Sequence, residues 1–253
     1  MLVEERQRVI LDHLRDKKTL TVEEAMEICD VSADTIRRDF RKLSEQNLAR
    51  RTHGGILLQG EYAADSPVRE RQVLHHEEKR RIGARAAQYI QPGETVAIDA
   101  GTTAIEVIPF LAELSDLTVL TYSLDVARAA VDSRSLTCIM LGGLIRDNTY
   151  SAVGPDTLSM VQHFQVTTLF LAANAISLDH GIMTPNRMEA EVKSALVEIA
   201  QRVILVADSS KIGRRALVSF SEISKVDVLV TDESADPAFV EAVSELGVSA
   251  SLV

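Results

Sequence analysis

The sequence predicts an α/β protein in which a mostly parallel β-sheet domain follows a small helical N-terminal domain. From Glu94 onward, short apolar runs rich in β-branched residues alternate with helical patterns, as is typical of a parallel sheet covered on both faces. Before residue 47, three short helical patterns follow one another. The chain has 253 residues, of which 46% are hydrophobic, and this is enough for two ordinary domains. We expect domains at 1–58 and 77–253, joined by a linker at 59–76.

The composition argues against several classes of protein. No run approaches the about 18 apolar residues of a membrane helix, and the N-terminal MLVEERQRVI is charged where a secretory signal is apolar. We therefore expect a cytoplasmic protein with no membrane partner. The two cysteines, Cys29 and Cys138, lie far apart in the chain, and the six histidines show no metal-binding spacing. The sequence accordingly predicts no disulfide framework, no metal and no cofactor.

The net charge of −10 is unevenly distributed along the chain. Residues 1–81 hold 16 basic and 16 acidic residues, so all of the excess negative charge lies in residues 82–253. Between Ser32 and Arg51, six basic residues occur with three acidic ones. The negative net charge is therefore compatible with a DNA-binding N-terminal domain on an acidic body.

The first two helical segments of the N-terminal domain have clear sequence signals. The first spans about 4–15, with Ile10 and Leu14 among the apolar residues on one side. The second begins at Thr21, which forms with Glu24 the T-x-x-E pattern of a capping box. Its apolar positions recur at helical spacing and predict a buried face: Val22, Ala25, Met26 and Cys29. Cys29 is therefore interpreted as a core residue and not as a nucleophile.

A third helix is expected after a short turn, with Ser32 as its N-cap. Ile36, Phe40 and Leu43 fall on one side and predict its buried face. The opposite arc carries long hydrogen-bond donors and their neighbours: Arg37, Arg38 and Arg41, beside Thr35 and Lys42. On a lone helix, such a face is more often an ordinary solvated surface. Here it follows a helix, a capped helix and a tight turn, which is the order of a helix-turn-helix motif whose last helix enters the major groove.

Residues 48–57 predict two short strands around a small turn, which would form a wing beside this motif. Gly54 and Gly55 allow the chain to reverse there. Arg50 and Arg51 are placed to contact flanking phosphates. His53 is weaker evidence, because a histidine in such a turn more often packs or hydrogen-bonds than contacts a base.

Three segments of this region carry a family resemblance. They are Glu5-Arg6, Val31-Ser32-Ala33-Asp34-Thr35-Ile36-Arg37-Arg38-Asp39-Phe40 and Leu48-Ala49-Arg50-Arg51-Thr52-His53-Gly54-Gly55. They resemble the DeoR family of bacterial transcriptional regulators, with Phe40 where leucine is usual. The resemblance implies that Asp39 orients neighbouring groups and does not touch DNA. The candidate DNA-binding residues are Ser32, Thr35, Arg37, Arg38, Arg41, Arg50, Arg51 and His53.

The body is expected to begin near Glu77 with a helical pattern that ends at Pro92-Gly93. Six strands are predicted, at 95–99, 117–121, 136–141, 168–172, 203–208 and 226–230. Helical patterns lie between most of them, the clearest at Met188 to Gln201. In parallel sheets of this kind, ligands bind beyond the carboxyl ends of the strands.

Polar residues gather at those strand ends. The first strand leads into Asp99-Ala100-Gly101-Thr102-Thr103, which could cradle a phosphate at a helix N-terminus, although such a turn is more often only a helix cap. The third strand ends in Gly142-Gly143 with Arg146 nearby, and a later one in Asp208-Ser209-Ser210-Lys211. Glu189 and Lys193 share one helix face and could equally form a surface ion pair. No GxGxxG or Walker motif supports a dinucleotide or nucleoside triphosphate site.

The body also resembles the DeoR family, through Glu78-Lys79-Arg80-Arg81-Ile82, Asp99 to Thr103, Gly142-Gly143, Gly181 to Asn186 and Ala207 to Arg214. The resemblance implies a fold similar to ribose-5-phosphate isomerase and coenzyme A transferases, and a site for phosphorylated sugars or related metabolites. Two departures fall in the expected pocket: Tyr122 where asparagine is common, and Ala172-Ala173-Asn174-Ala175 in place of G-x-D-G. The candidate effector-binding residues are Asp99, Gly101, Thr102, Thr103, Gly143, Arg146, Asn174, Glu189, Lys193 and Lys211.

The sequence therefore predicts a ligand-controlled repressor of a carbohydrate operon, which binds double-stranded operator DNA as a homo-oligomer, a dimer or tetramer. The alternative is a sugar-phosphate isomerase with an accessory DNA-binding domain. Isomerisation needs a positioned carboxylate base, and Ala172 to Ala175 contains none, although Asp99 and Glu189 remain. A purely architectural DNA-binding protein would not need an acidic body with a polar pocket. We expect no enzymatic activity.

Overall fold

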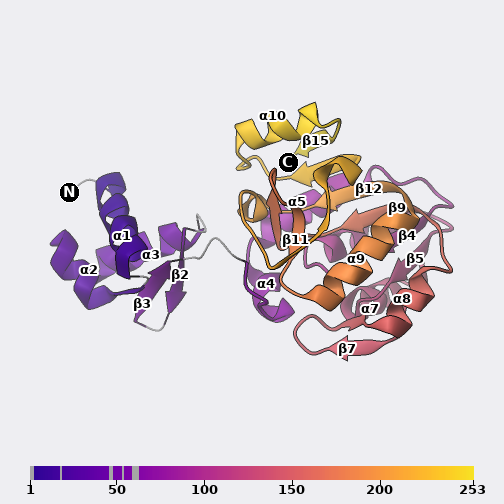
Figure 1. The fold of residues 1–253 in the computed structure, drawn as a ribbon, viewed down its shortest axis with the longest axis horizontal. Helices are drawn as coiled ribbons and strands as arrows, with labels where there is room; N and C mark the ends of the chain where they lie inside the picture. Colours follow the sequence, from indigo (N-terminus) through magenta and orange to yellow (C-terminus); the bar gives the residue numbers. More distant parts are fainter. Residues whose placement is uncertain (1–2, 18, 46–47, 53, 59–62) are drawn as a thin grey trace. The chain divides into compact units, whose positions relative to one another are not determined.

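A computed structural model describes residues 3–17, 19–45, 48–52, 54–58 and 63–253. The chain divides into two compact units, Met1–Glu61 and Tyr62–Val253, and Figure 1 shows the helices and strands of each. Among the described residues, no helix is long and apolar enough to cross a membrane.

The N-terminal unit contains three helices and a small antiparallel sheet. Its elements are α1 (Val3–Lys17), β1 (Thr19–Thr21), α2 (Val22–Cys29), α3 (Ala33–Glu45), β2 (Ala49–Thr52) and β3 (Gly55–Leu58). Cys29, Ile36, Phe40 and Leu43 are buried in its core, as predicted. The sheet order is β1-β3-β2, so the predicted hairpin is present and β1 adds a strand that the sequence did not indicate.

The start of α2 explains why the sequence did not predict β1. Thr21 Oγ1 accepts a hydrogen bond from the amide of Glu24, and a carboxylate oxygen of Glu24 accepts one from the amide of Thr21, which confirms the capping box. Thr21 is also the last residue of β1. A strand of three residues that ends on a helix cap is too short to produce its own alternating pattern.

The larger unit is built around a seven-stranded parallel sheet with the order β15-β14-β12-β9-β4-β5-β6. The strands are β4 (Thr95–Ile98), β5 (Thr118–Thr121), β6 (Thr137–Met140), β9 (Val166–Leu171), β12 (Ala200–Val206), β14 (Val228–Thr231) and β15 (Ser249–Leu252). The first six correspond to the six predicted strands, and β15 at the edge was not predicted. Every pairing in this sheet is parallel, which confirms the predicted fold class.

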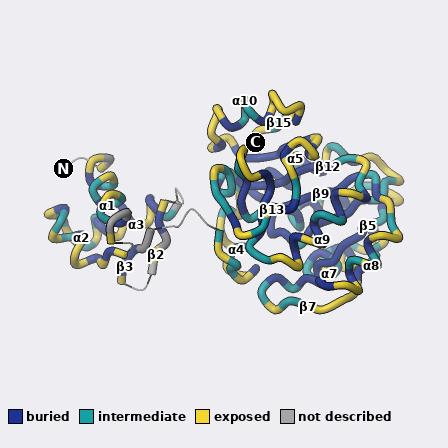
Figure 2. Tube along the Cα trace, viewed as in Figure 1, coloured by how far each residue is buried: buried dark blue, intermediate teal, exposed yellow. Residues whose placement is uncertain are grey.

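Helices cover both faces of this sheet. They are α4 (Val68–Val73), α5 (His76–Ala87), α6 (Ile108–Leu111), α7 (Leu124–Asp132), α8 (Pro155–Val161), α9 (Arg187–Ile199) and α10 (Pro237–Glu245). Along β4, Val96 and Ile98 pack in the core shared with α5, α6 and α7, whereas Ala97 packs in the core shared with α8, α9 and α10. Successive strand residues point to opposite faces, so apolar strands such as β4 are buried from both sides (Figure 2).

Two short sheets stand beside the main one. They comprise β7 (Leu144–Arg146) with β8 (Ser151–Val153), and β10 (Ala175–Ser177) with β11 (Gly181–Thr184) and β13 (Val218–Ser221). The helix expected to reach Gln201 ends at Ile199, because Ala200 already pairs with Val166 of β9 as the first residue of β12.

Of the segment expected as a linker at 59–76, the described residues 63–76 belong to the larger unit. It contains α4 and the first residue of α5. The amide of Ala63 donates to the carbonyl of Arg215 (2.6 Å), and the amide of Val68 donates to that of Asn148 (2.7 Å). Val68 itself is buried. The charged composition of this segment suggested a solvated hinge, but its polar groups have partners in loops that are distant in sequence.

Candidate functional site

The outer face of α3 follows from what its inner face buries. Ile36, Phe40 and Leu43 are fully buried against α1 and α2. Arg37, Arg38 and Arg41 are consequently exposed, as are Ser32 before the helix and Lys42 near its end. Ser32 Oγ and Thr35 Oγ1 lie 3.1 Å apart at the start of the helix.

Asp39 is on the same helix but faces inward. It is buried and forms an ion pair with Arg6 of α1, while Gln7 donates a further hydrogen bond to it (3.3 Å). The hydrogen bonds that Arg6 donates to Asp39 and the charge of Asp39 outweigh burial and raise the pKa of Arg6. Asp39 therefore fixes α3 on α1, in agreement with the orienting role that the resemblance implied.

The hairpin β2–β3 holds the remaining candidates for DNA contact. Arg51 is exposed on β2. For Arg50 only the backbone is described, where it pairs with Leu57. His53 lies outside the described residues.

In the larger unit, Asp99 at the end of β4 is completely buried and surrounded by donors. One carboxylate oxygen accepts from the amide of Ala100 (2.7 Å) and from the hydroxyl of Tyr122; the other accepts from the amide of Ala172 (2.8 Å) and from Lys193 Nζ. Burial and the charge of Asp99 raise the pKa of Tyr122 well above its ordinary value, so this tyrosine stays a hydrogen-bond donor. Asp99 thus joins the ends of three strands.

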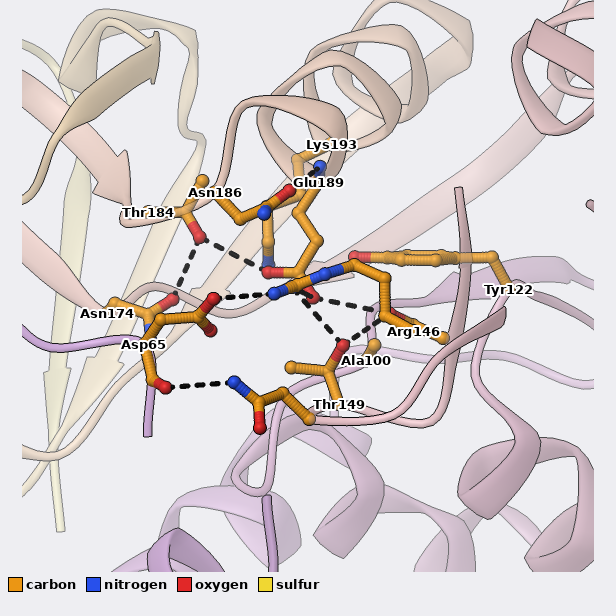
Figure 3. A network of polar contacts seen from close by, with 12 residues as sticks. Asp65, Ala100, Tyr122, Arg146, Thr149, Asn174, Thr184, Asn186, Glu189 and Lys193 are labelled. Atoms are coloured by element: carbon orange, nitrogen blue, oxygen red, sulfur yellow. Dashed lines mark hydrogen bonds and ion pairs between the residues drawn. The ribbon is translucent and has the colours of Figure 1, made fainter. Parts of the chain in front are cut away.

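Glu189 is the centre of a second buried network (Figure 3). Arg146 Nη1 lies 2.6 Å from one of its oxygens, and Ser151 donates to the same oxygen (3.2 Å). Thr184 Oγ1 lies 3.4 Å from the other oxygen and 3.1 Å from Asn174 Oδ1. Burial alone would lower the pKa of Arg146, but the neighbouring carboxylates outweigh it and raise that pKa.

Glu189 and Lys193 therefore do not form a surface ion pair. Both are almost completely buried on α9, and each is paired with a different residue, Arg146 and Asp99 respectively. The i, i+4 spacing correctly placed them on one helix face, and the fold turns that face inward.

The loop Gly101–Thr103 is held close to the end of β9. A Cβ atom on Gly101 would lie 2.1 Å from Cβ of Ala172, so only glycine fits. Thr102 and Thr103 are buried, and a small pocket beside them is lined by Val68 and Gln72 of α4 together with residues of the loop. The helix expected after the loop is only a 3-10 turn (Ala104–Val107) followed by α6, so a long helix dipole does not contribute here.

Four cations of the larger unit, Lys79, Arg71, Lys211 and Arg214, lie near one another, and Arg71 interacts electrostatically with Asp99 before this loop. Lys211 follows β12 in a 3-10 turn, with its Nζ 3.7 Å from Asp208 and 3.1 Å from Ser210 Oγ. Lys79 on α5 is 2% exposed and donates to the carbonyl of Arg71. Burial lowers the pKa of Lys79 to about 8, and it also lowers the pKa values of Arg71, Lys211 and Arg214. Repulsion from Lys211 and Arg71 further lowers the pKa of Lys79, and repulsion from Arg214 and Arg71 that of Lys211, so a bound anion would offset this repulsion.

Lys79 and Arg71 were missed as candidates. In the sequence, Lys79 belongs to a run of charges, yet it precedes the buried Ile82 by three positions and Ala86 by seven, and so lies on the buried stripe of α5. That spacing was the available signal. Gly143, by contrast, lies against α8, where a Cβ atom would meet Thr157 Oγ1 at 2.0 Å, and it takes no part in the Glu189 network.

Comparisons with known proteins cover both units. Residues 6–61 match the family model of a DeoR-like helix-turn-helix domain, and residues 74–233 match that of a DeoR C terminal sensor domain. The chain is 33% identical to the HTH-type transcriptional regulator GlpR of Haloferax volcanii, over 98% of this chain and 97% of that protein. It is 34% identical to the glycerol-3-phosphate regulon repressor of Escherichia coli (90% of each chain) and 30% identical to a putative aga operon transcriptional repressor of that species (98% and 93%).

Among solved structures, the chain is similar to a ribose 5-phosphate isomerase from Methanocaldococcus jannaschii and to translation initiation factor eIF-2B from Pyrococcus horikoshii. The first has a TM-score of 0.41 at 14% identity, over 54% of each chain. The second has a TM-score of 0.43 at 14% identity, over 84% of this chain and 69% of that one.

Proposed function

Because the chain belongs to the DeoR family of transcriptional regulators, we propose that it represses a carbohydrate operon under the control of a phosphorylated sugar or related metabolite. The names of two relatives, repressors of the glycerol-3-phosphate regulon and of the aga operon, support this kind of target. The observation that carries the proposal is the pairing of an exposed basic face on α3 with a group of buried and half-buried cations, Lys79, Arg71 and Lys211, in the other unit.

The N-terminal unit is proposed to insert α3 into the major groove of operator DNA. Ser32 lies directly before the motif's last helix, and Thr35, Arg37 and Arg38 occupy its N-terminal half, which is the part that contacts base edges in such motifs. Arg41 and the hairpin residues Arg50, Arg51 and His53 are assigned to the phosphate backbone. Two copies of the N-terminal unit are needed to bind two half-sites about one helical turn apart. We therefore propose a homo-oligomer that is held together by the larger unit.

The effector's phosphate is assigned to the loop Gly101–Thr103, with Lys79 and Lys211 as its counter-charges. Its hydroxyl groups are assigned to the network of Glu189, Arg146 and Asn174. Asp99 and Lys193 satisfy one another and the ends of β4, β5 and β9, so we assign them to the walls of the pocket. Gly143 is excluded from the assignment because it packs on α8.

We further propose that the pocket binds without turnover. The segment Ala172 to Ala175 has no carboxylate, and the amide of Asn174 cannot act as a base at neutral pH. Asp99 and Glu189 are each paired with a cation, Lys193 and Arg146 respectively. Each carboxylate would have to lose its ion pair before it could abstract a proton.

The test combines binding of effector and of DNA in one variant. In thermal-shift measurements, a phosphosugar at 100 times its dissociation constant should stabilise the protein by about 2.7 kcal/mol. Thr103→Val preserves the shape of the loop while removing a donor, so it should weaken effector binding and leave the affinity of ligand-free protein for operator DNA unchanged. Equal loss of both activities would indicate misfolding. Incorporation of solvent deuterium into the bound phosphosugar, abolished by Glu189→Gln, would instead place the protein among the enzymes.

A further inference from the structure

The segment 63–75, at the start of the larger unit in the chain, is held to the rest of that unit at several points. The amide of Ala63 donates to the carbonyl of Arg215, and that of Val68 to the carbonyl of Asn148. The side-chain amide of Asn148 donates in return to the carbonyl of Asp65 (3.1 Å). Further along, the carbonyl of Arg71 accepts from Lys79. We call this segment the strap.

The side chain of Asp65 ties the strap to the Glu189 network. Arg146 Nη2 lies 2.6 Å from a carboxylate oxygen of Asp65, and Nη1 of the same guanidinium lies 2.6 Å from Glu189 (Figure 3). The side chain of Arg146 is 9% exposed and that of Glu189 is 5% exposed, whereas that of Asp65 is 33% exposed. Asp65 is thus the most exposed of the three side chains. If it is displaced, Arg146 and Glu189 are left as an ion pair without net charge.

The strap also contributes to the small pocket beside the loop after β4. Val68 and Gln72 of α4 line the pocket together with Gly101 and Thr102. The Arg71 guanidinium, held by the carbonyl of Ser66 (3.2 Å), belongs to the cationic group around Lys79 and Lys211. One short segment therefore lies beside the loop assigned to phosphate and is also paired with Arg146, which is assigned to the hydroxyl groups.

We infer that Asp65 is a built-in competitor of the effector: its carboxylate occupies the Arg146 guanidinium, and a ligand oxygen that takes this place releases the strap. This inference rests on the proposed function and specifies its regulation. Since the strap is the part of the chain that leads to the N-terminal unit, displacement of Asp65 couples the pocket to the DNA-binding unit. A ligand shifts the equilibrium between the bound and the released strap only if its affinity for the two states differs. The affinities differ because the ligand can bind the Arg146 guanidinium only when Asp65 has left it.

The first experiment needs no ligand. Asp65→Asn removes the charge and keeps the shape and the backbone contact to Asn148, so the full-length variant should fold with an unchanged circular dichroism spectrum. Amide hydrogen exchange at Ala63 and Val68 should become about tenfold faster than in the unmodified protein, which corresponds to about 1.4 kcal/mol. Asp132→Asn, which breaks an exposed ion pair with Arg128 on α7, is the matched control and should leave exchange in the strap unchanged. Equal exchange in all three proteins overturns the inference.

The second experiment measures competition, with glycerol 3-phosphate, ribose 5-phosphate and 6-phosphogluconate as separate probes. A probe that binds the unmodified protein should bind Asp65→Asn several-fold more tightly and Asp132→Asn with unchanged affinity. Unchanged or weaker binding to Asp65→Asn overturns the inference. If none of the probes binds any form of the protein, the proposed effector site is wrong for these compounds. The exchange measurement still decides whether the ion pair of Asp65 with Arg146 holds the strap.

Discussion

At the scale of single residues, burial decides which charged side chains are available for binding. Asp39 and Arg37 are two positions apart on α3, yet Asp39 is buried against Arg6 and Arg37 is exposed. The ion pair of Arg37 with Asp34 (3.3 Å) is exposed on both sides, and such pairs contribute only about 0 to 1 kcal/mol. Arg37 is therefore free to exchange this partner for DNA at little cost.

Replacing Arg37 or Arg38 with alanine should weaken operator binding by about 1 to 3 kcal/mol if the side chain contacts a base, or reduce the salt dependence of binding by about one ion if it contacts a phosphate. Neither residue contributes to the core, so the unfolding temperature should not change. Fluorescence anisotropy with labelled operator at several salt concentrations distinguishes the two outcomes. Arg128→Ala, at an exposed arginine of the larger unit, is the control, and unchanged binding by both Arg37→Ala and Arg38→Ala would contradict the assignment.

Lys79 leads to a prediction about pH. Its pKa of about 8 lies below the ordinary 10.5, so the folded protein holds this proton less tightly than the unfolded chain, and the contribution of Lys79 to stability increases as pH rises from about 8 to 10.5. A bound phosphate favours the protonated form. Effector affinity should therefore fall about tenfold between pH 7 and pH 9.

Isothermal titration calorimetry with the tightest-binding phosphosugar can measure this dependence. Lys79→Met should bind the effector more weakly at pH 7 and should lose most of the decrease between pH 7 and 9. The control Lys225→Met alters an exposed lysine and should retain the decrease. A decrease of equal size in Lys79→Met would show that another group is responsible.

At the scale of elements, the loop after β4 depends on its close contact with the end of β9. Gly101 permits this contact, while Asp99 accepts hydrogen bonds from Ala100 of the loop and from Ala172 beyond β9. The two strand ends are thereby held as one unit, and β5 joins them through Tyr122. The geometry of the candidate phosphate site is thus set by neighbouring strands and not by the short 3-10 turn that follows it.

Gly101→Ala should destabilise the larger unit by about 1 to 3 kcal/mol, because the added methyl group overlaps that of Ala172. The double variant with Ala172→Gly removes the overlap and should recover a large part of this loss. Urea unfolding of the two single variants and the double variant measures the coupling. Gly142→Ala, where the nearest atom to a new Cβ is Met160 Sδ at 3.7 Å, is the tolerant control; additive effects of the Gly101 and Ala172 changes would exclude the contact as the cause.

At the scale of the whole molecule, the two units differ in their charge. The basic residues that face outward on α3 belong to the first unit, and nine of the ten excess negative charges belong to the second. Each unit has its own hydrophobic core. The strap makes its contacts within the second unit, and it follows the first unit in the chain.

A fragment that begins at Ala63 should therefore fold by itself and keep the effector-induced thermal shift of the full chain, because the strap and both cores are retained. It should not bind operator DNA. Differential scanning fluorimetry and anisotropy measurements on the fragment and the full chain test this directly. Loss of the thermal shift in the folded fragment would mean that the N-terminal unit contributes to effector binding.

The sequence by itself determined the order of elements: the capped α2, the basic outer face of α3, the hairpin and six parallel strands all follow from local spacing. The tertiary structure alone decided the partners of the charged residues. Asp65 meets Arg146 across 81 positions, and Lys193 meets Asp99 across 94. Periodicity places a residue on a face of its own helix or strand, whereas strand order and the path of the connecting segments determine what that face meets. For that reason the sequence indicated the strand ends as a site but not the strap that lies beside them.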